Sequence, residues 1–271
     1  MRVIVCLKQV VDPLTPADEL ALDRNRMRVL GPPRSAPVTN GYDEQALEAA
    51  LRLRNSLGEL EVVALSLGDR FQLDVMKRAL AVGADELVLV QDPGLDTWNA
   101  FRLAEVLAAA IAHLGGADLI LCGRQASDWD NALVPMVLAE YLGLPCLALA
   151  RSVGIVGQQV QVERALEDGV QLMEADLPAV VTVTSELGEL RYPTVKARLK
   201  AARQQPRLLS LAEIGAPPAR PPLLEVVDLD LPLSSRECQF VTGADGAEAG
   251  RSLAGILVGA SVAAPADNGR G

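Results

Sequence analysis

The first 150 residues alternate short aliphatic runs with longer segments of helical periodicity, and this alternation constrains the fold more than any other feature. Short runs of Val, Ile and Leu are typical of buried parallel strands, while longer amphipathic stretches are typical of the helices between them. Each run is followed by a polar or glycine-containing loop. The pattern therefore predicts βαβ units in an α/β fold, with an open, mostly parallel sheet and helices on both faces.

The pattern also places the elements along the chain. Strands are expected over residues 3–7, 61–67, 86–90 and 119–122, and helices over residues 44–57, 71–81, 98–113 and 132–142. After Pro145, β-rich pieces separated by turns predict a β-meander insertion over about residues 150–176. The apolar run at residues 177–183 is expected to rejoin the main sheet.

Beyond residue 190 the regularity fades. Six basic residues and no acidic one occur between Arg191 and Arg207, which indicates a solvated helix face. Residues 216–271 are rich in Pro and small residues and cannot bury enough surface alone, so they are expected to fold against a partner. We therefore expect an α/β domain over residues 1–205 and a C-terminal extension over residues 206–271 that packs on a partner subunit.

The charge balance and the hydropathy exclude several classes of function. The chain has 35 acidic and 25 basic residues and a net charge of -10, which repels nucleic acids and anionic lipid surfaces. The start of the chain lacks the pattern of a signal peptide, and its most apolar tail segment, residues 253–266, is shorter than the ~20 residues that span a bilayer. A cytoplasmic protein without membrane insertion is expected.

Residues for ordinary catalysis are scarce. The one histidine, His113, lies near the end of a predicted helix, and the four cysteines are far apart with no C-x-x-C pair. Neither a P-loop nor a G-x-G-x-x-G fingerprint follows the first strand. We therefore expect no metal site and no catalytic residues.

The most informative stretch is residues 119–131, where an aliphatic strand runs into Gly123 and a polar loop. Asp130 or Asn131 is the expected N-cap of the helix over residues 132–142. Ligands of open parallel sheets bind beyond the carboxyl ends of the strands, and backbone amides at a helix start can hold a phosphate. A capped turn without a ligand is the alternative. Polar loops at residues 7–10, 40–43 and 66–69 are expected at the same edge and would complete an adenosine-sized slot.

Several motifs resemble the β subunit of electron transfer flavoproteins, including the nitrogen-fixation-associated branch of that family. The most specific is Gly123-Arg124-Gln125-Ala126 with Asp128 and Asp130, which matches a Gly-[KR]-Gln-Ala-x-Asp-x-Asp loop. The other matching stretches, in the family's order over residues 2–200, are residues 3–12, 40–50, 79–85, 162–164, 177–182 and 189–192.

The resemblance implies an electron-carrier subunit rather than an enzyme. In the family the β subunit pairs with an α subunit that carries the redox-active FAD, and itself holds AMP or a second FAD. The heterodimer carries electrons from flavin dehydrogenases, often acyl-CoA dehydrogenases, toward a quinone-reducing enzyme. The implied fold is adenine nucleotide α-hydrolase-like, with a C-terminal arm that embraces the partner.

The resemblance also implies roles for particular residues. Those expected around the nucleotide are Cys6, Asn40, Gly41, Tyr42, Asp43, Leu67, Gly123, Arg124, Gln125, Ala126, Asp128, Asp130, Asn131, Ala132, Leu133 and Val134. A docking loop for the dehydrogenase is expected over residues 187–200, with Val195 as its apolar anchor. The residues assigned to docking are Leu187, Glu189, Arg191, Tyr192, Val195 and Lys200.

The sequence departs from the family pattern at both sites. Asn131, Leu133 and Pro135 stand where the family has a small residue, Gln and Gly near the phosphates, and Trp129 adds bulk. Leu133 has no side-chain donor, and Pro135 lacks a backbone N–H, so adenosine fits the predicted site better than a phosphate does, and a vacant or altered site is the alternative. In the docking loop, Gly188 and Leu190 replace the common Asn and Pro.

Two other functions fit the same α/β pattern. One is an adenine-nucleotide-binding module of the universal-stress type, which would form a homodimer without a partner. The other is a hydrolase that uses ATP, which would need a phosphate-gripping glycine-rich loop and a cation.

Overall fold

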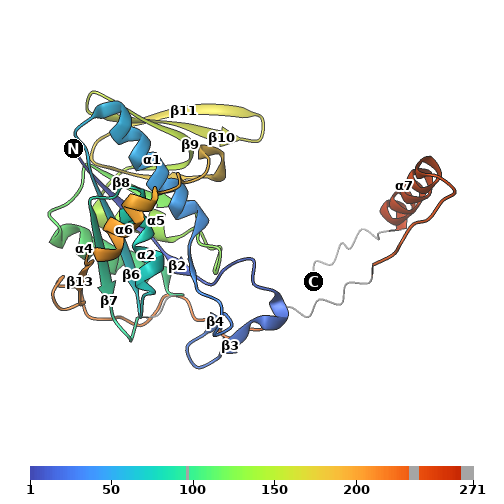
Figure 1. Cartoon of the computed structure of the whole chain (residues 1–271), viewed down its shortest axis with the longest axis horizontal. Coiled ribbons are helices and arrows are strands. Elements are labelled where there is room, and N and C mark those ends of the chain that lie inside the picture. Colours follow the sequence, from blue (N-terminus) through green and yellow to red (C-terminus); the bar gives the residue numbers. More distant parts are fainter. Residues whose placement is uncertain (96–97, 232–237, 264–271) are drawn as a thin grey trace. The chain divides into compact units, whose positions relative to one another are not determined.

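The computed structural model describes residues 1–95, 98–231 and 238–263 (Figure 1). It divides into two compact units, Met1–Leu231 and Pro232–Gly271. The described part of the second unit contains one long helix, α7 (Gly246–Ala263). Within the described ranges, every helix is too short or too polar to cross a membrane.

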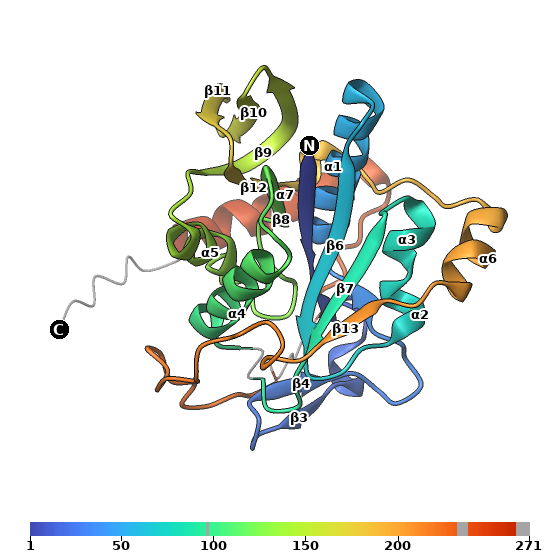
Figure 2. The same ribbon diagram turned by 90° about the vertical axis from the view of Figure 1, so that its left-hand side faces the viewer.

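A single large sheet organises the first unit (Figure 2). Among the described residues it has nine strands, in the order β11-β10-β9-β12-β8-β1-β6-β7-β13. The strands from β9 to β13 in this order are parallel, whereas β10 and β11 continue from β9 as an antiparallel meander. The bounds are β1 (Arg2–Leu7), β6 (Glu61–Gly68), β7 (Glu86–Gln91), β8 (Leu119–Gly123), β9 (Cys146–Val156), β10 (Gln159–Leu166), β11 (Gly169–Asp176), β12 (Ala179–Val183) and β13 (Arg207–Leu209). The predicted α/β class and the mostly parallel sheet are confirmed.

Helices cover both faces of this sheet. One face is packed against α1 (Gly41–Leu57), α2 (Leu73–Met76) and α3 (Arg78–Val82), and the other against α4 (Ala100–His113) and α5 (Val134–Leu142). A further helix, α6 (Val195–Arg203), packs on α3. The remaining short elements are β2 (Gln9–Val10) paired with β5 (Val38–Thr39), β3 (Ala21–Asp23) paired with β4 (Arg28–Leu30), and the 3-10 turns η1 (Ala17–Glu19) and η2 (Ser185–Leu187).

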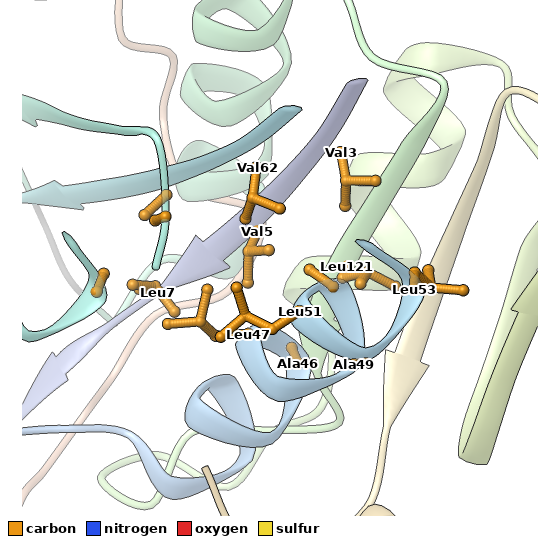
Figure 3. Close-up of a cluster of buried hydrophobic side chains, with 14 of the residues drawn as sticks. Val3, Val5, Leu7, Ala46, Leu47, Ala49, Leu51, Leu53, Val62 and Leu121 are labelled. Carbon is orange, nitrogen blue, oxygen red and sulfur yellow. The ribbon is translucent and has the colours of Figure 1, made fainter. Parts of the chain in front are cut away.

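The core follows the alternation of side chains along each strand. In β1, Val3 and Val5 belong to the cluster on the α1 face, while Ile4 belongs to the cluster on the α4 face. Leu47 and Leu51, one helical turn apart on α1, point toward β1 (Figure 3). Because both faces are covered, the central strands are apolar without interruption, as the sequence pattern predicts.

The order of the strands creates a crevice. From β1 the chain proceeds outward through β6 and β7, and then returns to place β8 on the other side of β1. The carboxyl ends of β1 and β8 therefore lie side by side where the direction of winding reverses. In open α/β sheets this switch point is where ligands bind.

Three predicted elements differ from the structure. The helix expected over residues 71–81 is divided at Lys77, whose ψ of -10° departs from helical geometry, into α2 and α3. The strand β13 was not predicted, because its three residues are too few to show a periodic pattern and it forms by pairing with β7. Helix α7 lies where we expected little regular structure, because its many small residues weaken the amphipathic signal.

Candidate functional site

The crevice at the switch point is built around Asp43, in the first turn of α1. The backbone N–H of Lys8, just past β1, donates to Asp43 Oδ2 at 2.7 Å, and the N–H of Gly123, at the end of β8, donates to Asp43 Oδ1 at 3.1 Å. One buried carboxylate therefore joins the ends of both strands to the start of α1.

Asn40, the residue before α1, holds the loop that follows β8. Its side-chain amide donates to the carbonyl oxygen of Gln125 at 2.8 Å, and its Oδ1 accepts from the N–H of Ser127 at 3.2 Å. The N–H of Asn40 donates to the carbonyl of Lys8 at 2.8 Å. Since Asn40 is almost fully buried, these bonds fix the loop against the helix start.

Gly123 allows this close approach. A Cβ at this position would lie 2.4 Å from Asp43 Oδ1 and 2.6 Å from Tyr42 Cβ. Such distances are far inside van der Waals contact, so only glycine fits between β8 and α1. The first residue of the sequence signature therefore has a packing reason that does not depend on a ligand.

The loop from residue 124 to residue 133 turns sharply before α5. Asp130 and Ala132 both have φ of +52°, a left-handed conformation that a helix cannot continue through. As a result α5 begins at Val134, with Leu133 as its N-cap and no side-chain cap. The prediction that Asp130 or Asn131 caps this helix is wrong: Asp130 Oδ1 accepts instead from Gln125 Nε2 at 2.5 Å.

Two adjoining cavities open at the crevice. The smaller, of about 100 Å³, is bounded by the ends of β1 and β8, by α4 and by the loop after β8. The larger, of about 600 Å³, lies toward the β3-β4 hairpin and shares Lys8, Leu67 and Trp129 with the smaller one. The two together fall in the range of roughly 300–1,000 Å³ that is usual for ligand pockets.

The structure brings most of the predicted nucleotide-site residues together. Ten of them line the smaller cavity: Cys6, Asp43, Leu67, Gly123, Gln125, Ala126, Asn131, Ala132, Leu133 and Val134. Asp128 lines the larger cavity and forms an ion pair with Lys8, in which Nζ and the carboxylate oxygen are 2.7 Å apart.

The other five predicted residues do not line either cavity: Asn40, Gly41, Tyr42, Arg124 and Asp130. Asn40 and Asp130 hold the loop through the hydrogen bonds given above. The Arg124 guanidinium lies 5.5 Å from the ring centre of Tyr42, a cation–π contact.

Some lining residues were not among those predicted for the site. Leu103 and Leu107 of α4 form one wall, and Cys122 faces the cavity beside Cys6. The leucines stand four residues apart, so helical spacing places them on one face, but only the tertiary fold shows that this face borders the crevice.

The electrostatics of the cavity centre on Asp43. Burial raises the pKa of Asp43 from 3.8 to about 7, against the smaller lowering effects of Asn40 and of the N–H groups of Lys8 and Gly123. The pKa of Cys122 is also raised, by its contact with Cys6 and by burial, so its thiol stays protonated. Among the described residues, no group of three or more His, Cys, Asp or Glu side chains could hold a metal ion. The cavity therefore offers a ligand apolar walls with a few polar groups among them.

The residues predicted for docking follow β12. Leu187 is buried, whereas Glu189 and Lys200 are exposed. Tyr192 and Val195 are 84% and 74% exposed. Arg191 is paired with Glu48 of α1 at 2.9 Å.

The fold and the crevice define a doubly wound α/β protein with a cavity at its switch point. Comparison with known proteins is more specific. Residues 35–213 match the family model described as the electron transfer flavoprotein domain. The chain is 34% identical over 228 residues to the electron transfer flavoprotein subunit beta of Megasphaera elsdenii, covering 81% of this chain and 82% of the relative.

Two further relatives show the same similarity. The electron transfer flavoprotein subunit beta of Mycobacterium bovis is 33% identical over 223 residues, covering 79% of this chain and 80% of the relative. The caffeyl-CoA reductase-Etf complex subunit CarD of Acetobacterium woodii is 33% identical over 223 residues, covering 80% and 81%. The chain belongs to the electron transfer flavoprotein family, among its β subunits.

Proposed function

We propose that this chain is the β subunit of a heterodimeric electron carrier in the cytoplasm. It would accept electrons from a flavin dehydrogenase of the acyl-CoA dehydrogenase type and deliver them toward a quinone-reducing acceptor. The observation that carries the proposal is the cavity at the switch point, walled by the family's signature loop and by the start of α1. A carrier needs no acid, base or nucleophile of its own, which agrees with the chemistry of this cavity.

The proposed ligand of the β site is AMP or a second FAD, in an adenine nucleotide α-hydrolase-like fold. Apolar walls from Leu67, Leu103 and Leu107 suit an adenine ring, and Lys8 between the two cavities suits a phosphate. A bound flavin would supply the redox chemistry, while this chain's residues bind it, orient it and exclude water. Leu133 and Pro135 at the start of α5 offer fewer donors, so Lys8 is expected to be the main phosphate contact.

The proposed docking surface for the dehydrogenase is the segment of residues 187–200. Tyr192 and Val195 present apolar surface to solvent. Lys196 and Lys200 on α6 are exposed beside them. Exposed apolar groups rimmed by charge are typical of transient protein interfaces.

The proposed contact with the α subunit involves the C-terminal arm. In α7, Leu253, Ile256 and Val258 are 46%, 41% and 65% exposed within a helix that carries few charges. An apolar helix of this kind gains stability by packing on another chain. The FAD that carries the electrons would belong mainly to that α subunit.

The test uses the heterodimer made by co-expression with an α subunit. Nucleotides released from the purified complex are identified by mass spectrometry, and flavin is measured by absorbance. Lys8→Met removes the cation and leaves Asp128 without its ion-pair partner, so it should lower β-site nucleotide content about tenfold or more. Lys77→Met, on α2–α3 away from the crevice, is the matched control and should leave the content unchanged.

Three results would contradict the proposal. One is a chain that forms a stable homodimer and never associates with an α subunit, as a universal-stress-type module would. Another is turnover of ATP that is lost on Asp128→Ala, as a hydrolase would show. The third is a heterodimer whose β-site nucleotide is equally retained in both lysine variants.

A further inference from the structure

The docking segment of residues 187–200 is held at its base by one buried carboxylate of α1. Glu48 is 5% exposed, and the guanidinium of Arg191 binds it in a bidentate pair. Arg191 Nε donates to Glu48 Oε2 at 2.9 Å, and Nη2 donates to Oε1 at 3.0 Å. The backbone N–H of Arg191 also donates to Oε2, at 3.1 Å. Three hydrogen bonds therefore fix both the side chain and the backbone of Arg191.

A second arginine ties the start of the segment to the same carboxylate. Arg52 lies one turn further along α1, and its Nε donates to Glu48 Oε1 at 3.1 Å. Its Nη1 donates to the carbonyl oxygen of Leu187 at 2.7 Å. Leu187 and Arg191 are thus connected through Glu48 to one helix, although 143 residues separate Glu48 from Arg191 in the sequence.

The charge state of Glu48 suits this role. Burial by itself raises the pKa of a carboxyl group, but the hydrogen bonds from Arg191 and Arg52 outweigh it, and the pKa of Glu48 is lowered. A bidentate arginine pair of this kind is directional, so it sets an orientation as well as a contact. Lysine in place of Arg191 would keep the charge but lose the fork.

Immediately beyond this base lie Tyr192 and helix α6, which packs on α3. Tyr192, Val195 and Leu199 are 84%, 74% and 61% exposed, so the apolar groups offered for docking have little packing of their own to orient them. Flexible groups pay an ordering cost when they bind, and a rigid base removes part of it.

We propose that Glu48 is a positioning residue for docking. It holds Arg191 and, through Arg52, Leu187, so that Tyr192 and Val195 meet the dehydrogenase already oriented. This inference rests on the proposed function, because it assumes that residues 187–200 contact the electron donor.

The experiment compares steady-state reduction of the full heterodimer by a dehydrogenase of the acyl-CoA dehydrogenase class, used as the probe with its acyl-CoA. Glu48→Gln should raise the KM for the heterodimer about tenfold and leave kcat within about twofold, because docking is impaired and electron transfer in the docked complex is not. Arg191→Lys should give a smaller rise. Nucleotide and flavin content should match those of the wild type.

A control variant separates docking from a general loss of an ion pair. Glu105→Gln breaks a half-buried pair on the other face of the sheet, where Arg102 Nη1 lies 2.6 Å from Glu105 Oε2. This variant should leave the KM unchanged. In the double variant Glu48→Gln with Arg191→Lys, the KM should be no higher than in Glu48→Gln alone, since both changes remove one interaction.

Val195→Asp distinguishes failure of this inference from failure of the proposed function. If Val195→Asp raises the KM and Glu48→Gln does not, the docking segment is real and the positioning role is overturned. If neither variant changes the KM, the proposed docking surface is wrong, and the inference falls with it. If Glu48→Gln does not assemble, Arg191→Lys decides: a raised KM, with faster amide hydrogen exchange in residues 187–194, supports the role, and an unchanged KM overturns it.

Discussion

The crevice at the start of α1 and the segment of residues 187–200, which we propose for docking, are each held by a buried carboxylate of that helix, but the two carboxylates have different partners. Asp43 is bonded to two backbone N–H groups, from Lys8 and Gly123. Glu48, five residues later, is bonded to two arginines. Burial dominates at Asp43 and raises its pKa to about 7, whereas the arginines prevail at Glu48 and lower its pKa.

This difference shows that burial and ion pairing act in opposite directions on two carboxyl groups of one helix. Burial raises the pKa of Asp43 to about 7, so the charge of the crevice varies near neutral pH. Arginines hold Glu48 ionised and fix the direction of the docking segment. Asp43 therefore lies at the base of a cavity, whereas Glu48 lies beneath the exposed segment of residues 187–200 that we propose for docking.

The largest expected effect is the pH dependence that Asp43 imposes on folding. The folded chain keeps the proton of Asp43 up to about pH 7, while the unfolded chain releases it near pH 3.8, so ionisation between these values costs stability. Relative to Asp43→Asn, the wild type should lose up to about 4 kcal/mol of unfolding free energy as pH rises from 4 to 7. Urea denaturation across this range tests it, with Asp74→Asn, an exposed position on α2, as the control. If the unfolding free energies of the wild type and of Asp43→Asn change with pH in parallel, the raised pKa of Asp43 is refuted.

The next effect is steric and probes how tightly the crevice is packed. In Gly123→Ala the new methyl group would clash with Asp43 and Tyr42, so we expect the unfolding free energy to fall by about 3 kcal/mol or more. We also expect the variant to lose the nucleotide that we propose for the β site. Gly169→Ala is the matched control, because a Cβ there meets nothing within 4 Å. Thermal unfolding and nucleotide content measure both consequences, and equal stability of the two variants would mean that α1 can move away from β8.

Glu48→Gln should lower the unfolding free energy by a smaller amount, about 2 kcal/mol at pH 7, because the guanidinium of Arg191 keeps access to water. Its pH dependence has the opposite sign to that of Asp43. Since the folded pKa of Glu48 lies below 4.5, its contribution is present above pH 4.5 and is lost as pH falls through the folded value. The wild type and variant curves should therefore converge on acidification, and a gap that widens below pH 4.5 would contradict this account.

The smallest effect is expected at the exposed tip of the docking segment. Val195→Ala should change the unfolding free energy by no more than about 0.5 kcal/mol, whereas Val181→Ala, at a fully buried position in β12, should cost about 2 kcal/mol. Chemical denaturation of both variants measures the contrast. A loss at Val195 close to that at Val181 would show that this side chain belongs to the core rather than to a free surface.

Much of the architecture could be predicted from hydrophobic periodicity. The strand over residues 119–122 and the following glycine are correct to within a residue, and ten predicted nucleotide-site residues line one cavity. The start of α5 could not be predicted, because left-handed residues such as Asp130 and Ala132 leave no signal when neither is glycine. The leucines of α4 at the cavity were missed because a helical pattern indicates that a face is buried and does not indicate what covers it.

The sequence by itself determined the class of fold, the loops that follow the strands and the family, because local periodicity and short motifs depend on near neighbours along the chain. Only the tertiary structure decided which strands lie side by side, and hence that the ends of β1 and β8 form the crevice. The tertiary structure also decided the partner of Glu48. Along a helix, a charged side chain reaches only residues three or four positions away, whereas Arg191 is 143 positions further along the sequence. Contacts between distant segments depend on how the layers pack, and the free energy of that packing belongs to the whole domain rather than to any one stretch of sequence.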